Sequence, residues 1–196
     1  MPRSPARPSP AAAPAVPSRA PPAPAARSPL SAALSDFEFT LITLMYGFTR
    51  WVETCMDAAD VRGLSGLDIL VLHTTNHRAR DRRMSEICMV LNIDETHLVA
   101  YALKKLIAAG LVRVRTHGRE HLYETTPAGD AACAAYRRVR EEFLVAGLAL
   151  THGAEQLAQI ERVMRTLLGQ YDQAGRFATA ASIARPRRPP PVRTKR

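Results

Sequence analysis

The fold is decided by residues 83–129, which read RMSEICMVLNIDETHLVAYALKKLIAAGLVRVRTHGREHLYETTPAG. Apolar residues recur at steps of three and four through two runs, 85–91 and 94–109, with a short turn between them. This spacing predicts two amphipathic helices, because residues three and four apart share one face of a helix. We expect Ser85 to cap the first helix and Asp94 the second, since both side chains can accept a backbone N–H.

A β-hairpin is predicted directly after the second helix. Gly110 follows that helix, where a glycine is typical of a helix C-terminus. Two β-like runs come next, at 111–115 and 121–126, and His117-Gly118 supplies the turn between them. Two short helices followed at once by a hairpin describe a winged helix-turn-helix, a DNA-binding motif.

Two further helices are predicted before this motif. A Ser followed three residues later by an acid is the spacing of a capping box, and it occurs at Ser35 and at Ser65. The apolar pattern then predicts helices at 37–59 and at about 65–77.

The chain after the hairpin is also predicted to be helical. Pro127 stands where a helix can begin, and the only interruption is expected near 150–153. The fold class is therefore mainly α with a small β-hairpin wing: a winged helix-turn-helix plus terminal dimerisation helices.

Proline and charge divide the chain into three parts. Ten of the fifteen prolines lie at or before Pro29, and four lie at or after Pro186. Residues 1–34 carry four Arg and no acid, and residues 176–196 carry six Arg, one Lys and no acid. We expect both basic, proline-rich tails to be disordered and residues 35–175, with 16 basic and 18 acidic side chains, to form the globular domain.

At this point the sequence resembles the MarR family of bacterial regulators over about residues 35–175. Three pieces in order carry the resemblance: Arg83-Met84-Ser85-Glu86-Ile87-Cys88 with Leu91, then Leu103-Lys104-Lys105-Leu106-Ile107-Ala108-Ala109-Gly110-Leu111-Val112, and then Thr126-Pro127-Ala128-Gly129. Segments 74–78 and 94–97 are also similar to an LdtR-like subgroup. The resemblance implies a homodimer that binds double-stranded DNA and regulates transcription. At the wing tip, Arg119 matches the family's Arg, but His117 stands where an Asp is usual.

Positive charge independently supports DNA binding. Residues 77–126 hold nine Lys and Arg but six acids, so this segment is basic while the rest of the globular domain is not. The alternative is an ordinary solvated face. The predicted base contacts, at the start of the second helix of the motif, are Thr96, His97, Ala100 and Tyr101. The predicted phosphate contacts are Arg78, Arg80, Arg82, Arg83 and Lys104, and the predicted wing contacts are Arg115, His117 and Arg119.

The terminal helices are expected to join two copies of the chain. The apolar stripe at 37–59 is too wide for a helix that rests on one small domain. We therefore expect dimerisation helices at 35–60 and 128–175 around a DNA-binding lobe at about 64–126. The alternative is that these helices complete a monomeric core.

An effector site is a further hypothesis. Met45, Phe48, Trp51 and His73 could line a pocket for a small molecule, although such a stripe is more often core. Cys55 has no neighbouring basic residue in sequence to lower its pKa, so inert packing is favoured over redox sensing.

Other classes of function have little support. The sequence has no glycine-rich phosphate loop, no metal-ligand spacing and no nucleophile with an evident base, so we expect no enzyme, no cofactor and no metal. It also lacks an apolar stretch of membrane-spanning length, and we expect a cytoplasmic, nucleoid-associated protein. The alternative function is a sequence-tolerant architectural DNA binder whose tails supply the affinity.

Overall fold

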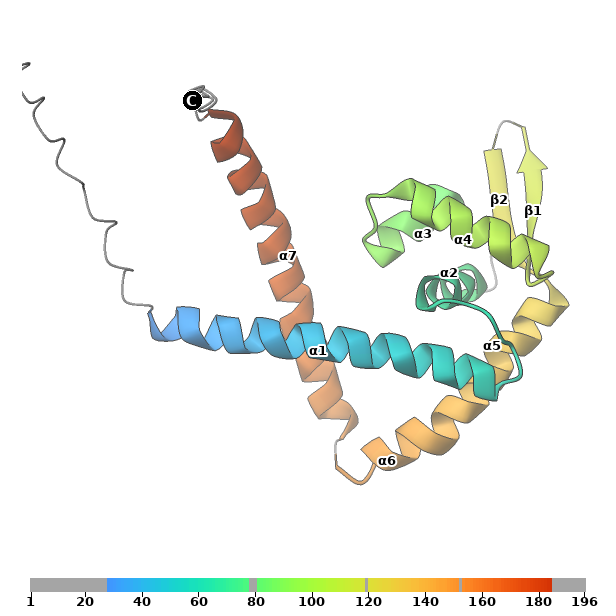
Figure 1. Cartoon of the computed structure of the whole chain (residues 1–196), viewed down its shortest axis with the longest axis horizontal. Coiled ribbons are helices and arrows are strands. Elements are labelled where there is room, and N and C mark those ends of the chain that lie inside the picture. Colours follow the sequence, from blue (N-terminus) through green and yellow to red (C-terminus); the bar gives the residue numbers. More distant parts are fainter. Residues whose placement is uncertain (1–27, 78–80, 119, 152, 185–196) are drawn as a thin grey trace, which may run out of the picture. The chain divides into compact units, whose positions relative to one another are not determined.

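The computed structural model describes residues 28–77, 81–118, 120–151 and 153–184 (Figure 1). Internal contacts divide the chain after Tyr46, and the winged helix lies entirely in the second unit. In chain order the elements are α1 (Pro29–Ala58), α2 (Gly66–Asn76), α3 (Met84–Leu91), α4 (Thr96–Ala108), β1 (Val112–His117), β2 (Glu120–Thr125), α5 (Pro127–Arg140), the π-helix η2 (Glu141–Val145), α6 (Ala146–Leu148) and α7 (Ala154–Ala184).

Helix α1 begins earlier than predicted. Pro29 is its first residue, and the Ser28 hydroxyl accepts the backbone N–H of Ser31 at 3.1 Å. Proline suits the first helical position because its missing N–H has no intrahelical partner there. The predicted cap at Ser35 is therefore wrong: its hydroxyl donates to the carbonyl of Ser31, as an internal helical Ser often does.

The capping box of α2 is confirmed. The Ser65 hydroxyl accepts the N–H of Asp68, and the Asp68 carboxylate accepts the N–H of Ser65 at 2.8 Å. Glu53 of α1 accepts the next N–H, that of Gly66, at 2.7 Å. Two of the free donors at the start of α2, the N–H groups of Gly66 and Asp68, are thus satisfied by side chains, one of which comes from α1.

The two helices of the motif form where predicted, but with different caps. The N-cap of α3 is Arg83, whose N–H donates to the Glu86 carboxylate at 2.9 Å, so Ser85 lies inside the helix. Helix α4 begins at Thr96, and Asp94 contributes its backbone carbonyl rather than its side chain to the preceding turn. Both cap predictions are wrong because the backbone turns one or two residues away from the expected positions.

The hairpin is confirmed and gains a third partner. Strands β1 and β2 pair antiparallel, from Val112 opposite Thr125 to His117 opposite Glu120, around Gly118 at φ 63°. The backbone of Arg82 pairs with Tyr123 through two hydrogen bonds of 2.9 and 2.8 Å. The connector before α3 is thereby attached to the wing.

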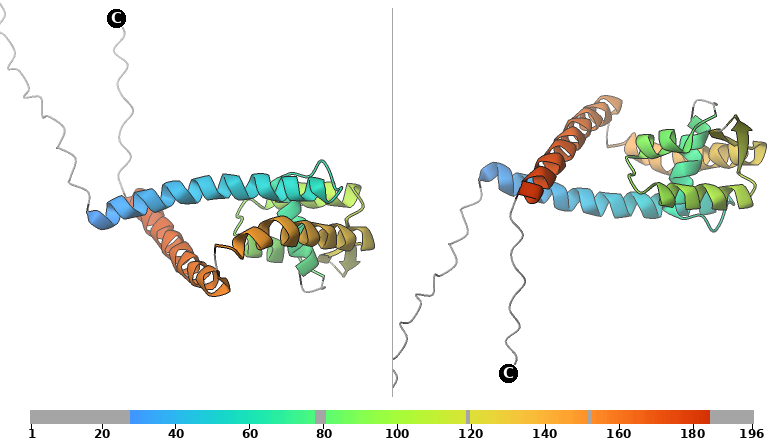
Figure 2. Two further views of the ribbon diagram at one scale, coloured as in Figure 1. Left: turned by 90° about the horizontal axis from the view of Figure 1, so that it is seen from below. Right: turned by 90° about the horizontal axis from the view of Figure 1, so that it is seen from above.

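One core lies beneath the motif, where α2 packs against α3 and α4 (Figure 2). Helix α1 contributes its C-terminal end to the buried residues. The buried apolar side chains are Val52, Cys55, Met56, Ile69, Val71, Leu72, Ile87, Cys88, Val99, Ala102, Leu103, Leu106, Leu111, Val112, Ala132 and Cys133.

The segment Thr126 to Gly129 fastens the wing to α5. The Thr126 hydroxyl donates to the carbonyl of Gly110 at 2.6 Å and accepts the N–H of Gly129 at 3.2 Å. A Cβ on Gly129 would lie 2.0 Å from the carbonyl oxygen of Leu111, so only glycine fits. This geometry explains why a Thr and a Gly stand at these positions.

The C-terminal region is helical with the predicted interruption. Helix α5 continues through η2 into α6, and a turn at 149–151 follows α6. Helix α7 runs to Ala184, past the predicted end of the domain at residue 175. From 154 to 183 its residues are exposed, except for half-buried Leu167.

Candidate nucleic-acid interface

The four predicted base-contact residues share the outer face of α4. Thr96, His97, Ala100 and Tyr101 are all exposed, and Tyr101 keeps 71% of its surface. The opposite face of the helix is buried in the core through Val99, Ala102, Leu103 and Leu106. The steps of three and four between the exposed residues make them neighbours on one surface.

Helix α4 is held in place by an ion pair on its inner side. Lys105 donates to the buried Asp68 carboxylate at 2.7 Å. Although burial opposes ionisation, the hydrogen bonds from Lys105 and Ser65 hold the pKa of Asp68 below its ordinary value. Lys105 is therefore engaged in an ion pair with α2, whereas its neighbour Lys104 is exposed.

Arg83 is exposed but already paired. Its Nε and Nη2 atoms both donate to Oε2 of Glu120, at 2.9 and 2.6 Å. The Glu120 carboxylate raises the pKa of the Arg83 guanidinium. A hollow of about 280 Å³ adjoins this pair and is lined by Arg83, Met84, Ser85, Glu120, His121 and Tyr123.

Arg82 does not lie where a phosphate contact is needed. It is 4% exposed, and its Nη2 atom donates to the backbone carbonyl of His77 at 3.0 Å. The backbone of Arg82 forms an isolated β-bridge with Tyr123 beside the hairpin, and the side chain is buried. This burial argues against the predicted phosphate contact of Arg82.

One face of the wing is charged. Arg115 and His117 are exposed, and the Arg115 guanidinium lies 3.6 Å from Asp81 and 3.8 Å from Glu124. Arg113 donates to Glu124 at 2.6 Å. That hydrogen bond is the main cause that holds the pKa of the Glu124 carboxyl below its ordinary value. The predicted contacts Arg78, Arg80 and Arg119 lie outside the described residues.

Sequence reasoning missed Glu120 and Glu124 as partners of these arginines. The signal was present, because a hairpin that turns at Gly118 places Arg113 opposite Glu124. Cross-strand neighbours of opposite charge stabilise a hairpin. The pairing of Arg83 with Glu120 had no such signal, since it depends on the connector joining the wing.

The residues of the effector hypothesis have different surroundings. Trp51 is half-buried against the core, His73 is half-buried on α2, and Phe48 is exposed. Met45 belongs to the first unit of the chain. His73 meets the ring of Tyr136 edge to face at 4.4 Å, and its Nε2 atom is buried without a hydrogen-bond partner among the described residues. Burial, then Arg137 and Arg140, lowers the pKa of His73.

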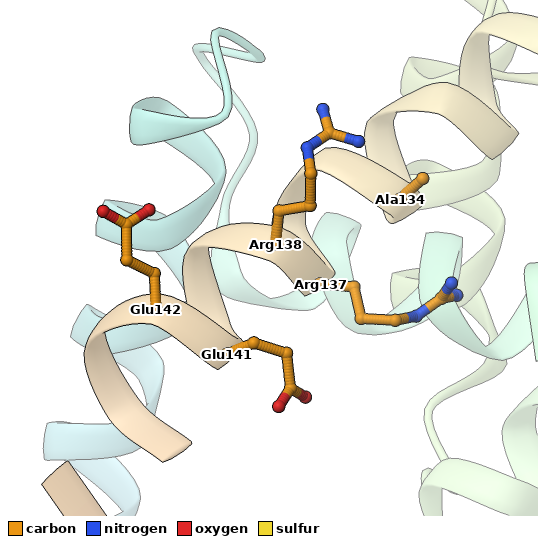
Figure 3. Close-up of a pocket in the computed structure, with 5 residues that line it drawn as sticks. All are labelled: Ala134, Arg137, Arg138, Glu141 and Glu142. Atoms are coloured by element: carbon orange, nitrogen blue, oxygen red, sulfur yellow. The ribbon is translucent and has the colours of Figure 1, made fainter. Parts of the chain in front are cut away.

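A further hollow lies elsewhere. It measures about 650 Å³ and opens beside the end of α5 and the start of η2 (Figure 3). Its described lining residues are Ala134, Arg137, Arg138, Glu141 and Glu142. Figure 3 shows the two guanidinium groups and the two carboxylates directed away from the helix, and the hollow is open to solvent. None of the four residues of the effector hypothesis lines it.

The described part of the chain contains neither a candidate metal site nor a candidate membrane span. No group of three His, Cys, Asp or Glu side chains there is placed to hold a metal ion. Among the described helices, none is both long and apolar enough to cross a membrane. The three thiols are buried, and burial raises the pKa of Cys133 to about 11.

Comparison with known proteins agrees with this geometry. A family model described as a winged helix DNA-binding domain matches residues 64–129. A search of curated proteins gives no significant match. A MarR family regulator from Neisseria meningitidis aligns with a TM-score of 0.60 and 18% identity over 72% of this chain and 95% of its own.

Two further solved structures are similar. MarR from Staphylococcus aureus, in complex with salicylate and kanamycin, gives a TM-score of 0.57 and 17% identity over 74% of this chain and 95% of its own. A mutant MarR from Escherichia coli, complexed with operator DNA, gives a TM-score of 0.51 and 19% identity over 66% of this chain and 94% of its own. The predicted fold class is confirmed: the chain is a winged helix protein with the fold of the MarR family regulators.

Proposed function

We propose that the chain is a transcriptional regulator that binds a pseudo-palindromic DNA operator as a homodimer, and not an enzyme. The outer face of α4 carries this proposal: Thr96, His97 and Tyr101 are exposed together, while the inner face is fixed in the core. A helix held in this way can enter the major groove and bring hydrogen-bonding side chains to base edges. The similar E. coli MarR is complexed with operator DNA.

Exposed apolar surface on the terminal helices supports the dimer. Large apolar side chains that are exposed on α1 include Leu30, Leu34, Phe39, Ile42, Leu44, Met45, Tyr46 and Phe48. Those exposed on α7 include Leu157, Ile160, Val163, Met164, Leu168, Tyr171, Phe177 and Ile183. A monomer rarely leaves so much apolar surface in water. We propose that a second copy covers these helices, so that 35–60 and 128–175 join two DNA-binding lobes.

A small aromatic anion is the effector that the chemistry around His73 favours. The rings of His73 and Tyr136 meet there, and the charges of Arg137 and Arg140 act on the imidazole. Aromatic walls and nearby positive charge suit a ring that carries a carboxylate. The similar S. aureus MarR is in complex with salicylate. We propose that such a ligand changes the separation of the two recognition helices and so the affinity for DNA.

The alternative is a sequence-tolerant architectural DNA binder. The segments 1–34 and 176–196 together carry eleven positive charges and no acid, which favours affinity without base contacts. A regulator and an architectural protein would both act on chromosomal DNA, so we expect a cytoplasmic location with the nucleoid. The similarity of segments 74–78 and 94–97 to the LdtR-like subgroup stays a prediction.

Selection of bound duplexes from a random pool tests the proposal. The full-length protein should enrich a pseudo-palindrome with half-sites about one helical turn apart. Competition of that duplex against random DNA at fixed salt should then show at least about a thousandfold preference. No enriched sequence, with tight binding to every duplex, would favour the architectural protein. Genome-wide recovery of bound DNA would identify the regulated genes.

A further inference from the structure

The outer face of the wing carries two ion pairs that differ in their access to solvent. Arg113 pairs with Glu124, whose side chain is 16% exposed, and Arg83 pairs with Glu120, whose side chain is 48% exposed. Glu124 also lies near Arg115, so one shielded carboxylate serves two guanidinium groups. A single oxygen of Glu120 accepts both hydrogen bonds from Arg83, and both side chains of that pair are exposed to solvent.

This difference separates a fixed contact from an exchangeable one. Arg113 and Glu124 are directly opposite each other in the hairpin register, so the strands hold them together. Arg83 is at the N-cap of α3 and Glu120 is the first residue of β2, so their pair joins two elements beside the turn of the hairpin. Solvent-exposed ion pairs are weak and are screened by salt, so another anion can replace the carboxylate.

We propose that Glu120 is an internal competitor of the DNA backbone for Arg83, so that binding of DNA exchanges a carboxylate for a phosphate. The inference rests on the proposed function, because it assumes that the face containing α4 and the wing meets a duplex. Ser85 and His121 line the hollow beside the pair, and their polar side chains add hydrogen-bonding groups for the incoming phosphate oxygens.

The exchange has a consequence for affinity and for its salt dependence. In the free protein Arg83 is already neutralised, so its contact with phosphate releases fewer counterions than an unpaired arginine would release. The carboxylate freed from Arg83 then lies near the DNA backbone and is repelled by it. Glu120 therefore weakens binding to every sequence alike, and only duplexes that also make base contacts with α4 stay bound at low protein concentration.

Substitution of Glu120 by Gln tests the competition. The variant keeps the size of the side chain and removes the charge. We expect affinity for operator and random duplexes to rise by about two- to fivefold, the range of an exposed ion pair. The slope of log affinity against log salt should steepen by up to about 0.9, the value for one phosphate contact. Fluorescence anisotropy between 50 and 200 mM salt measures both quantities.

Two controls make the result specific. Glu161→Gln removes an equal charge from another exposed ion pair, that of Glu161 with Arg165 on α7, and should leave the affinity and the salt slope close to wild type. In a protein that already carries Arg83→Gln, Glu120→Gln should raise the affinity for DNA by no more than Glu161→Gln does. Circular dichroism and light scattering establish that each variant is folded and has the wild-type oligomeric state.

Each outcome is decisive. A gain that depends on Arg83 supports competition. A gain of equal size with Glu161→Gln, or a gain that persists without Arg83, overturns it in favour of a general charge effect. Loss of affinity in Glu120→Gln also overturns it, because Glu120 would then position Arg83 for the phosphate. If the wild-type protein binds no duplex at all, the proposed function itself fails, and that result is distinct from a silent Glu120→Gln.

Discussion

Lys105 of α4 donates to the buried carboxylate of Asp68 at the start of α2, with 2.7 Å between Nζ and Oδ2. The same carboxylate accepts the N–H and the hydroxyl of Ser65. One acid therefore caps α2 and fixes the inner side of α4. A buried polar group that loses its partner costs about 1–3 kcal/mol, so this small network contributes to the stability of the whole motif.

We predict that Asp68→Asn destabilises the protein by about 1–3 kcal/mol at pH 7, because Lys105 loses its charged partner. The pKa of Asp68 is lower in the folded state than its ordinary value of 3.8. Its contribution is therefore complete above that value and is lost as the pH falls through the folded pKa. Urea denaturation of wild type and variant from pH 7 to pH 3 measures both effects.

Lys105→Met is the matched control for this pair. Its cost should not add to that of Asp68→Asn in the double variant, since the two substitutions remove one interaction. Full additivity of the two costs would show that the pair contributes nothing to folding.

The junction between wing and α5 gives a second prediction. Gly129→Ala should destabilise the protein by about 1–3 kcal/mol, the cost of overpacking, because its Cβ would lie 2.0 Å from the carbonyl oxygen of Leu111. Gly147→Ala is the control: a Cβ there meets nothing within 4 Å, and the residue is helical. We expect Gly147→Ala to be neutral or to stabilise by up to about 1 kcal/mol. Equal thermal midpoints for the two variants would contradict this account.

These two sites show how far the sequence could predict the fold. The order of helices and hairpin follows from apolar spacing and from Gly110 and Gly118, whose positive φ angles suit glycine. Helix ends depend on which of several local capping signals the backbone uses, and spacing alone does not decide between them. Helix α1 begins at Ser28 and Pro29, a start signal that the more familiar capping-box spacing at Ser35 concealed.

The candidate site was predictable in part, for a related reason. An exposed face of α4 follows from helical periodicity, so Thr96, His97 and Tyr101 could be placed together. Arg82 could not be placed, because charge favours exposure, whereas pairing with Tyr123 in the sheet buries the side chain. Its neighbour Arg83 has the same charge but is exposed, and only the strand register distinguishes them.

A third prediction separates base contacts from phosphate contacts. Alanine at Thr96, His97 or Tyr101 should weaken preference at one or two positions of each half-site, at about 1–3 kcal/mol for each lost base contact. Lys104→Ala should instead weaken all duplexes alike and reduce the salt slope by about one. Binding measured against a panel of single-base operator variants distinguishes the two patterns. Equal losses on every duplex for all four variants would refute base reading by α4.

Arg82→Met gives this series a structural control. Because Arg82 is buried, we expect a change in thermal stability without a change in the salt slope. A reduced slope in a fully stable variant would restore Arg82 as a phosphate contact.

The fourth prediction concerns the dimer. Replacement of Ile160 and Leu168 by Glu places two charges on the exposed apolar side chains of α7 and should prevent a second copy from covering them. Light scattering at micromolar concentration should give twice the chain mass for wild type and the single mass for the variant. Gln170→Glu, on the same helix but not apolar, should leave the mass doubled. A wild-type monomer that binds a palindrome tightly would contradict the proposed dimer.

The fifth prediction concerns His73, which should be neutral in the free protein at pH 7. Its folded pKa lies below the ordinary value of 6.5 because of burial and of Arg137 and Arg140. The unfolded chain therefore binds the proton more readily, and stability should decrease as the pH falls below about 6.5. His73→Gln should remove that part of the decrease in urea denaturation at pH 7.5 and 5.5.

Salicylate then tests whether this imidazole belongs to an effector site. An anion bound beside His73 would favour the imidazolium and would also attract Arg137, so the ligand should raise the pKa of His73. Nuclear magnetic resonance titration of the histidines, with His73→Gln to assign the signal, measures the shift directly. Arg137→Gln should weaken the effect, because one of the two positive charges is lost. A His73 resonance that titrates identically with and without salicylate, while the ligand still releases DNA, would place the effector site elsewhere.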